Sequence, residues 1–116
     1  MTILELPWPP AVLNPNARAH WAKKDKARKK YRGDCLILAR QHNRQHKPVI
    51  PEGMIKIEIA FHPPRKGGRD VDNMLASIKS GLDSVAEAWG VDDSRFAFTL
   101  EMGEVVKFGA VLVKLP

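Results

Sequence analysis

Residues 55–61 read IKIEIAF, and this stretch indicates the fold more clearly than any other. Every second residue from Ile55 to Phe61 is apolar, and the residues between them are charged or small. A period of two is typical of a strand with one buried face, because successive side chains point to opposite faces of a sheet. The same alternation recurs at residues 96–102. Shorter apolar stretches at 3–6 and 105–114 complete a predicted set of four strands.

Two helices are predicted between these strands. Apolar residues between Val71 and Trp89 recur at spacings of three and four over five turns, and Gly90 is well placed to cap the C-terminus. Residues 20–45 contain no proline, and their apolar residues, which include Trp21, Tyr31 and Leu38, lie roughly on one stripe. The predicted order is β-α-β-α-β-β. This order indicates a single α/β (α+β) domain over residues 1–116, with a mixed sheet of about four strands.

The composition narrows the class of protein. The chain has 116 residues, a hydrophobic fraction of 44%, and 19 Lys and Arg against 13 Asp and Glu, for a net charge of +6. We expect no membrane span, since no apolar run exceeds a handful of residues. The first residues lack the basic and apolar regions of a signal peptide, and the single cysteine, Cys35, fits a reducing compartment. The sequence therefore predicts a cytoplasmic protein that binds a polyanion.

Two pairs of aspartates are the candidate metal-binding residues. Asp70 and Asp72 flank one residue where the helix at 71–89 begins, and Asp92 and Asp93 follow its predicted cap. Carboxylate oxygens are ligands that Mg²⁺ prefers, so the four residues suggest a divalent-metal site. The alternative is structural, because aspartate is also favoured at helix N-caps and in turns. A continuous helix would hold the pairs nearly 30 Å apart. Such a site closes within one chain only if the helix ends early or the chain doubles back, and otherwise it forms between subunits.

Positive charges are concentrated in two segments, the second of which directly precedes the first of these pairs. Residues 23–32 read KKDKARKKYR, with seven positive charges in ten residues, and residues 65–69 add three more. We expect these segments to contact phosphates, although a solvated helix face is the alternative for the first. Lys79 lies seven residues after Asp72 and therefore on the same face of a continuous helix, where it is a candidate for stabilising a phosphate.

The chain resembles the RusA-like Holliday junction resolvases, a family often encoded by phages and prophages. The resemblance lies in LPWPP at residues 6–10, RDVDN at 69–73 and GVDD at 90–93, which recur in this order and spacing. It spans nearly the whole chain, including NARAHW at residues 16–21.

This resemblance implies a homodimeric, Mg²⁺-dependent endonuclease, with Mn²⁺ as a substitute, that nicks four-way DNA junctions symmetrically in recombination and repair. Two equivalent sites suit the approximate two-fold symmetry of a junction. Asp70 and Asp72 match the aspartates of the family, and Asp93 best matches its third acid. Ala76 stands where some members have the catalytic lysine, so Lys79 is the candidate substitute. The predicted DNA-binding residues are Arg18, His20, Lys23, Lys24, Lys26, Lys30, Arg65, Lys66 and Arg69.

Two other functions remain open from the residues alone. The first is a basic DNA- or RNA-binding protein without catalysis, in which the aspartates only cap helices and form turns. The second is a metal nuclease that acts on other branched nucleic acids. Cleavage that depends on metal separates the first alternative from both nucleases.

Overall fold

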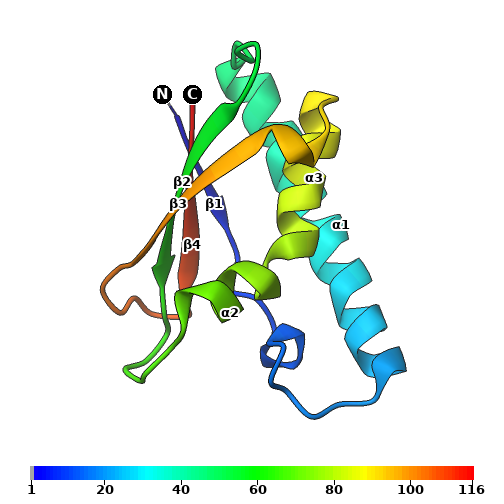
Figure 1. Ribbon diagram of the computed structural model, residues 1–116, viewed down its shortest axis with the longest axis vertical. Helices are drawn as coiled ribbons and strands as arrows, with labels where there is room; N and C mark the ends of the chain where they lie inside the picture. The colour runs from blue at the N-terminus through cyan, green and yellow to red at the C-terminus, as the bar shows by residue number, and fades with distance from the viewer. Residues whose placement is uncertain (1) are drawn as a thin grey trace.

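The computed structural model describes residues 2–116 as a mixed four-stranded sheet with helices packed against one face (Figure 1). The strands are β1 (Thr2–Leu6), β2 (Ile55–His62), β3 (Phe96–Met102) and β4 (Ala110–Leu115), in the sheet order β1-β4-β2-β3. β2 and β3 run parallel, whereas β4 runs antiparallel to both β1 and β2. The predicted single α+β domain is therefore confirmed.

The alternation of apolar and polar residues in β2 buries one face of the strand, as predicted. Its alternate residues from Ile55 to Phe61 are almost completely buried, and they form the middle of the hydrophobic core. The intervening Lys56 and Glu58 are exposed on the face of the sheet that carries no helix. Burial of these four side chains holds the sheet to the helix layer and fixes the register of β2, because a shift of one residue would expose all of them.

The predicted final strand at residues 105–114 is wrong in its start. β4 begins at Ala110, and it pairs with β1 and β2 rather than with β3. Because β3 occupies the far edge of β2, the chain has to cross the C-terminal end of β2 before β4 can pair. Residues 103–109 make this crossing as a loop, in which the Gly103 amide donates to the Phe61 carbonyl (2.8 Å) and the Val106 amide to the Pro63 carbonyl (3.0 Å).

The long helix α1 (Trp21–His46) packs on the core through only part of its length. Its buried residues begin at Tyr31 and continue through Cys35, Ala39 and His42, at helical spacing. Trp21 is 73% exposed, so its assignment to the apolar stripe was wrong. The helix extends past α3 at its N-terminal end, as Figure 1 shows. This projecting part carries most of the positive charges of residues 23–32.

The single helix predicted at residues 71–89 is broken into α2 (Val71–Ser77) and α3 (Lys79–Trp89). Ile78 leaves the helical conformation (φ −102°, ψ 8°), and its side chain is fully buried. The Ser77 hydroxyl donates to the Asn73 carbonyl four residues earlier (2.8 Å), a bond that favours bending of a helix. The break frees α3 to pack along α1, and the left-handed Gly90 caps it as predicted.

Two short 3₁₀ helices, η1 (Ala11–Leu13) and η2 (Asp93–Arg95), complete the chain. None of the helices in residues 2–116 is both long and apolar enough to cross a membrane.

Candidate functional site

Asp70 and Asp72 lie together at the N-terminus of α2. Asp70 is the N-cap residue, and its Oδ1 accepts a hydrogen bond from the Asp72 amide (2.9 Å). The capping role that the sequence offered for Asp70 is thus confirmed, since the cap satisfies one free amide of the first turn. Both side chains are exposed, and within residues 2–116 no lysine, arginine or histidine forms an ion pair with either carboxylate. Capping therefore leaves two adjacent negative charges open to solvent.

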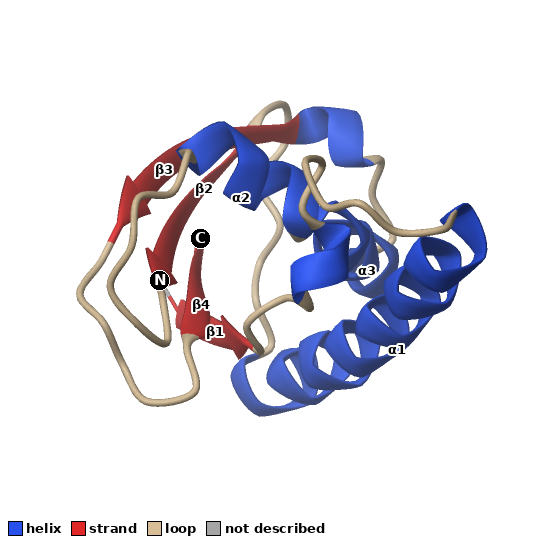
Figure 2. Cartoon of the chain, turned by 90° about the horizontal axis from the view of Figure 1, so that it is seen from below, coloured by secondary structure: helices blue, strands red, loops and turns tan. Residues whose placement is uncertain are grey.

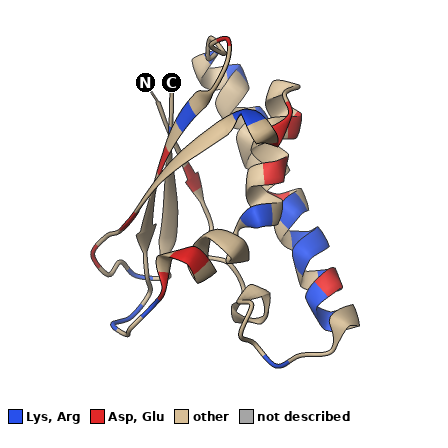
Figure 3. Cartoon of the chain, viewed as in Figure 1, with Lys and Arg blue, Asp and Glu red and all other residues tan. Residues whose placement is uncertain are grey.

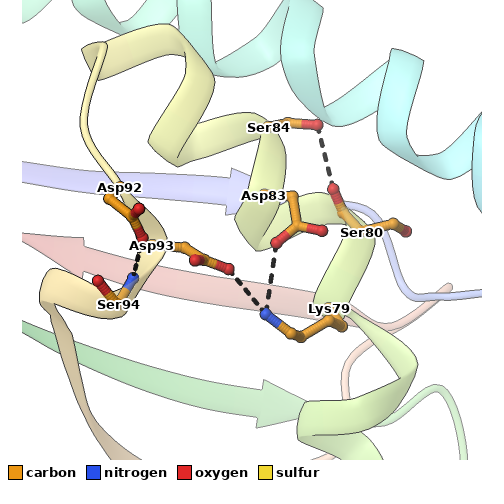
Figure 4. Close-up of polar contacts among 7 residues, drawn as sticks. All are labelled: Lys79, Ser80, Asp83, Ser84, Asp92, Asp93 and Ser94. Atoms are coloured by element: carbon orange, nitrogen blue, oxygen red, sulfur yellow. Dashed lines mark hydrogen bonds and ion pairs between the residues drawn. The ribbon is translucent and has the colours of Figure 1, made fainter.

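The second pair divides into two roles. Asp92 caps η2, and its Oδ1 accepts from the Ser94 amide (2.9 Å). Asp93 instead points toward the start of α3, where its Oδ2 accepts from the Lys79 ammonium at 2.9 Å (Figure 4). The same ammonium reaches Asp83 Oδ1 at 3.4 Å, one turn along α3. The chain therefore doubles back along α3 after Gly90, which brings Lys79 and Asp93 together within one subunit.

The Lys79–Asp93 pair changes the pKa of both groups. The hydrogen bond from Lys79 lowers the pKa of Asp93, with further lowering from Asp83. The same bond raises the pKa of Lys79 and so favours the charged form of its ammonium further. Because the pKa of Asp93 is lowered on folding, the pair stabilises the fold at neutral pH and the effect is lost as the pH falls through that folded-state pKa. Both side chains are well exposed, so this stabilisation is weak.

The structure does not gather the three predicted metal ligands into one group. Asp93 is held by Lys79, whereas Asp70 and Asp72 lie at the far end of α2 from Lys79. In the part of the chain that the structure describes, no three histidine, cysteine, aspartate or glutamate side chains lie close enough to hold a metal ion. The donor chemistry of Asp70 and Asp72 nevertheless fits Mg²⁺, which commonly uses one or two carboxylates and completes its shell with water and substrate phosphates.

The basic residues of α1 separate into paired and unpaired sets. Lys30 forms an ion pair with Asp34 (2.9 Å), and Asp25 is shared between Arg28 and Lys29. Among the described residues, the predicted phosphate contacts Lys23, Lys24 and Lys26 have no such partner. His20 caps α1, where its Nδ1 accepts from the Ala22 amide (3.1 Å), and Arg18 is exposed in the preceding loop. Three unpaired lysines thus lie in the first two turns of the helix.

The second basic segment comes directly before Asp70. The Arg69 guanidinium donates to the Arg65 carbonyl (3.0 Å) and lies over the Trp8 ring, 5.6 Å from its centroid. Lys66 is exposed. In the view of Figure 3 this loop and the basic end of α1 lie on either side of α2, whose first turn carries negative charge. In this view the negatively charged start of α2 therefore lies between two segments that carry unpaired positive charge.

Two residues of this region were not predicted as site residues. Asp83 follows Lys79 by four positions, a spacing that favours an ion pair on a helix, and this signal was available in the sequence. Trp8 entered the sequence analysis only as part of the LPWPP motif, although its ring lies under the guanidinium of Arg69, 61 positions away. Nothing local predicts that contact, because it depends on how the N-terminal loop packs.

Replacing Lys79 with alanine is expected to raise the pKa of Asp93 toward the ordinary carboxyl range, because the ammonium that lowers it is removed. A titration of side-chain carboxyl carbons by NMR measures this directly. Lys56→Ala, at an exposed lysine on β2, is the matched control and should leave Asp93 unchanged. An unaltered Asp93 titration in the Lys79 variant would contradict the pairing.

Comparison with known proteins identifies one relative and no family model. A protein of Xylella fastidiosa (strain Temecula1 / ATCC 700964), described as an uncharacterized protein, is 40% identical over 116 residues. The similar region covers 99% of this chain and 76% of the relative. No family model matches the chain.

Proposed function

We propose that this chain, which belongs to the same protein family as the Xylella fastidiosa protein, is a Mg²⁺-dependent endonuclease that cuts branched DNA. The observation that carries the proposal is the pair of exposed, unneutralised carboxylates of Asp70 and Asp72 between two basic segments. Positive charge on these segments attracts the phosphate backbone toward the carboxylates. A divalent cation bound by the carboxylates offsets their repulsion of the phosphates.

The residues of the candidate site have different roles in such a reaction. Asp70 and Asp72 would hold the metal ion, which when bound supplies orientation of the attacking water and stabilisation of negative charge. Asp93 fixes the position of the Lys79 ammonium, and its hydrogen bond favours the charged form of that group. A protonated lysine at that place is suited to stabilising negative charge on a substrate phosphate. Lys23, Lys24 and Lys66 provide the nonspecific backbone contacts that determine how tightly DNA is held.

The resemblance to the RusA-like family narrows the kind of DNA that we propose as the substrate. It supports a four-way junction as the DNA, nicked symmetrically by a homodimer, with recombination and repair as the process. A metal nuclease that acts on flaps or other branched nucleic acids has the same residue chemistry. The cytoplasm is the compartment that the proposal implies, and the free thiol of the buried Cys35 is consistent with its reducing conditions.

A basic DNA- or RNA-binding protein without catalysis is the second candidate. The caps favour it, because Asp70 and Asp92 each have a structural hydrogen bond and Asp93 has an ion pair. It predicts binding that ignores Mg²⁺ and no cleavage of any substrate.

Cleavage of a labelled mobile four-way junction tests the proposal. We expect paired, symmetric nicks with Mg²⁺ and none in its absence, and no cutting of a linear duplex of the same sequence. Binding without nicking under both conditions would exclude the nuclease and support the second candidate. Cutting of flaps in preference to junctions would instead reassign the substrate.

A further inference from the structure

Phe108 combines two unfavourable features in a single residue. Its side chain is 82% exposed, and its backbone adopts a left-handed conformation (φ 67°). For a bulky residue a positive φ is a genuine outlier, which persists only where the surrounding structure imposes it. The fold thus holds a large apolar ring in water at a position with an unfavourable backbone conformation.

The loop that carries Phe108 is firmly anchored. The Gly103 and Val106 amides donate to the Phe61 and Pro63 carbonyls, as described above, and the Gly109 amide donates to the Val106 carbonyl (3.0 Å). His62 Nδ1 donates to the Glu104 carbonyl (2.9 Å), since a carbonyl oxygen only accepts. The ring of Phe108 is therefore presented from a fixed base.

This anchoring also joins Phe108 to the candidate site. Gly109 has φ 71°, and a Cβ there would lie 2.9 Å from Trp8 and 3.1 Å from Pro64. The same Trp8 ring lies under the guanidinium of Arg69, the residue directly before Asp70. The loops 63–70 and 103–109 lie side by side when the molecule is seen from below (Figure 2). Trp8 thus connects the loop that carries Phe108 with the segment that directly precedes Asp70.

The surroundings of Phe108 suit a nucleobase and its phosphate. A hollow of about 420 Å³ lies beside the ring, with Lys107, Glu5 and His62 also on its walls. The Lys107 ammonium lies 5.2 Å from the centroid of the Phe108 ring, so an apolar face and a positive charge are presented together. Aromatic side chains stack on any base, and carboxylates accept hydrogen bonds from exocyclic amino groups.

We propose that Phe108 stacks on an unpaired or splayed nucleobase at the branch point of the DNA, while Lys107 contacts the neighbouring phosphate. A base inside a continuous duplex has no free face, so this contact favours branched over linear DNA. The inference rests on the proposed function and adds to it a residue that discriminates between the two kinds of substrate.

Binding of a four-way junction with 2-aminopurine at the branch point tests the inference, with EDTA present so that no cleavage occurs. Phe108→Ala is expected to weaken junction binding by about tenfold, the loss of one stacked base, and to remove the fluorescence change that the wild type produces. Duplex binding should be unchanged, and Phe108→Tyr should restore both signals. Val49→Ala is the matched control, since Val49 is 86% exposed in the loop before β2.

Several outcomes would overturn the inference. Wild-type binding and fluorescence in Phe108→Ala would remove the stacking role, while Mg²⁺-dependent cleavage by the wild type would leave the proposed function intact. An equal loss for junction and duplex would show a general contact rather than base stacking. Conversion of a dimer to a monomer in light scattering would assign Phe108 to a protein interface. Failure of the wild type to cleave would overturn the proposed function alone, because binding by Phe108→Ala is measured independently.

Discussion

Replacing Asp72 with asparagine is expected to abolish junction nicking while leaving junction binding within about twofold of the wild type. The loss should be at least on the order of 10²–10³, the range found when a group that stabilises a transition state is removed. Asparagine keeps the size of the side chain but removes its charge, so a divalent cation loses its main attraction to the site. Multiple-turnover cleavage with Mg²⁺ and gel-shift binding without it give the two quantities.

The partner substitution Asp70→Asn separates charge from capping. Asparagine is as good an N-cap as aspartate, so the hydrogen bond to the Asp72 amide and the thermal stability should both be retained. We still expect nicking to be lost, because the carboxylate is gone. Glu52→Gln, at an exposed acid before β2, is the control for a general loss of negative charge. Wild-type nicking by both aspartate variants would leave these residues with structural roles only.

Replacing Gly81 with valine is expected to cost about 3 kcal/mol of unfolding free energy. Gly81 lies on α3 against α1, where a Cβ would come within 2.8 Å of the Tyr31 ring and 2.9 Å of Cys35 Sγ. Tyr31 has little freedom to move, since it is buried and its hydroxyl donates to the Pro7 carbonyl (2.7 Å). Any larger residue at this position therefore has to push the two helices apart.

Gly33→Val provides the matched control on the other helix. Gly33 is also helical, but a Cβ there would meet nothing within 4 Å. Valine and glycine differ by only a few tenths of a kcal/mol in helix propensity, so we expect a change within about 0.5 kcal/mol. Urea unfolding followed by circular dichroism measures both variants. Equal effects at the two glycines would show that contact between α1 and α3 is not what requires Gly81.

Local sequence patterns determined most of the secondary structure. The alternation at residues 55–61 predicted β2 and its buried face, because a period of two allows only one side of a strand to meet the core. The candidate carboxylates Asp70 and Asp72 were also found from the sequence, since their spacing at a helix start is a local signal. The left-handed cap at Gly90 was predicted for the same reason.

Only the tertiary structure decided how these elements meet. Periodicity continued through Ile78, but burial of that side chain and the packing of α3 on α1 broke the helix there. β4 inserted between β1 and β2 because both its edges found hydrogen-bonding partners there and one of its faces packs on the core, a preference that no single segment encodes. The pairing of Lys79 with Asp93, the contact of Arg69 with Trp8 and the exposure of Phe108 follow from that arrangement. Each joins residues that are distant in the chain or depends on what the rest of the fold leaves uncovered, whereas sequence periodicity reports only on neighbours along one element.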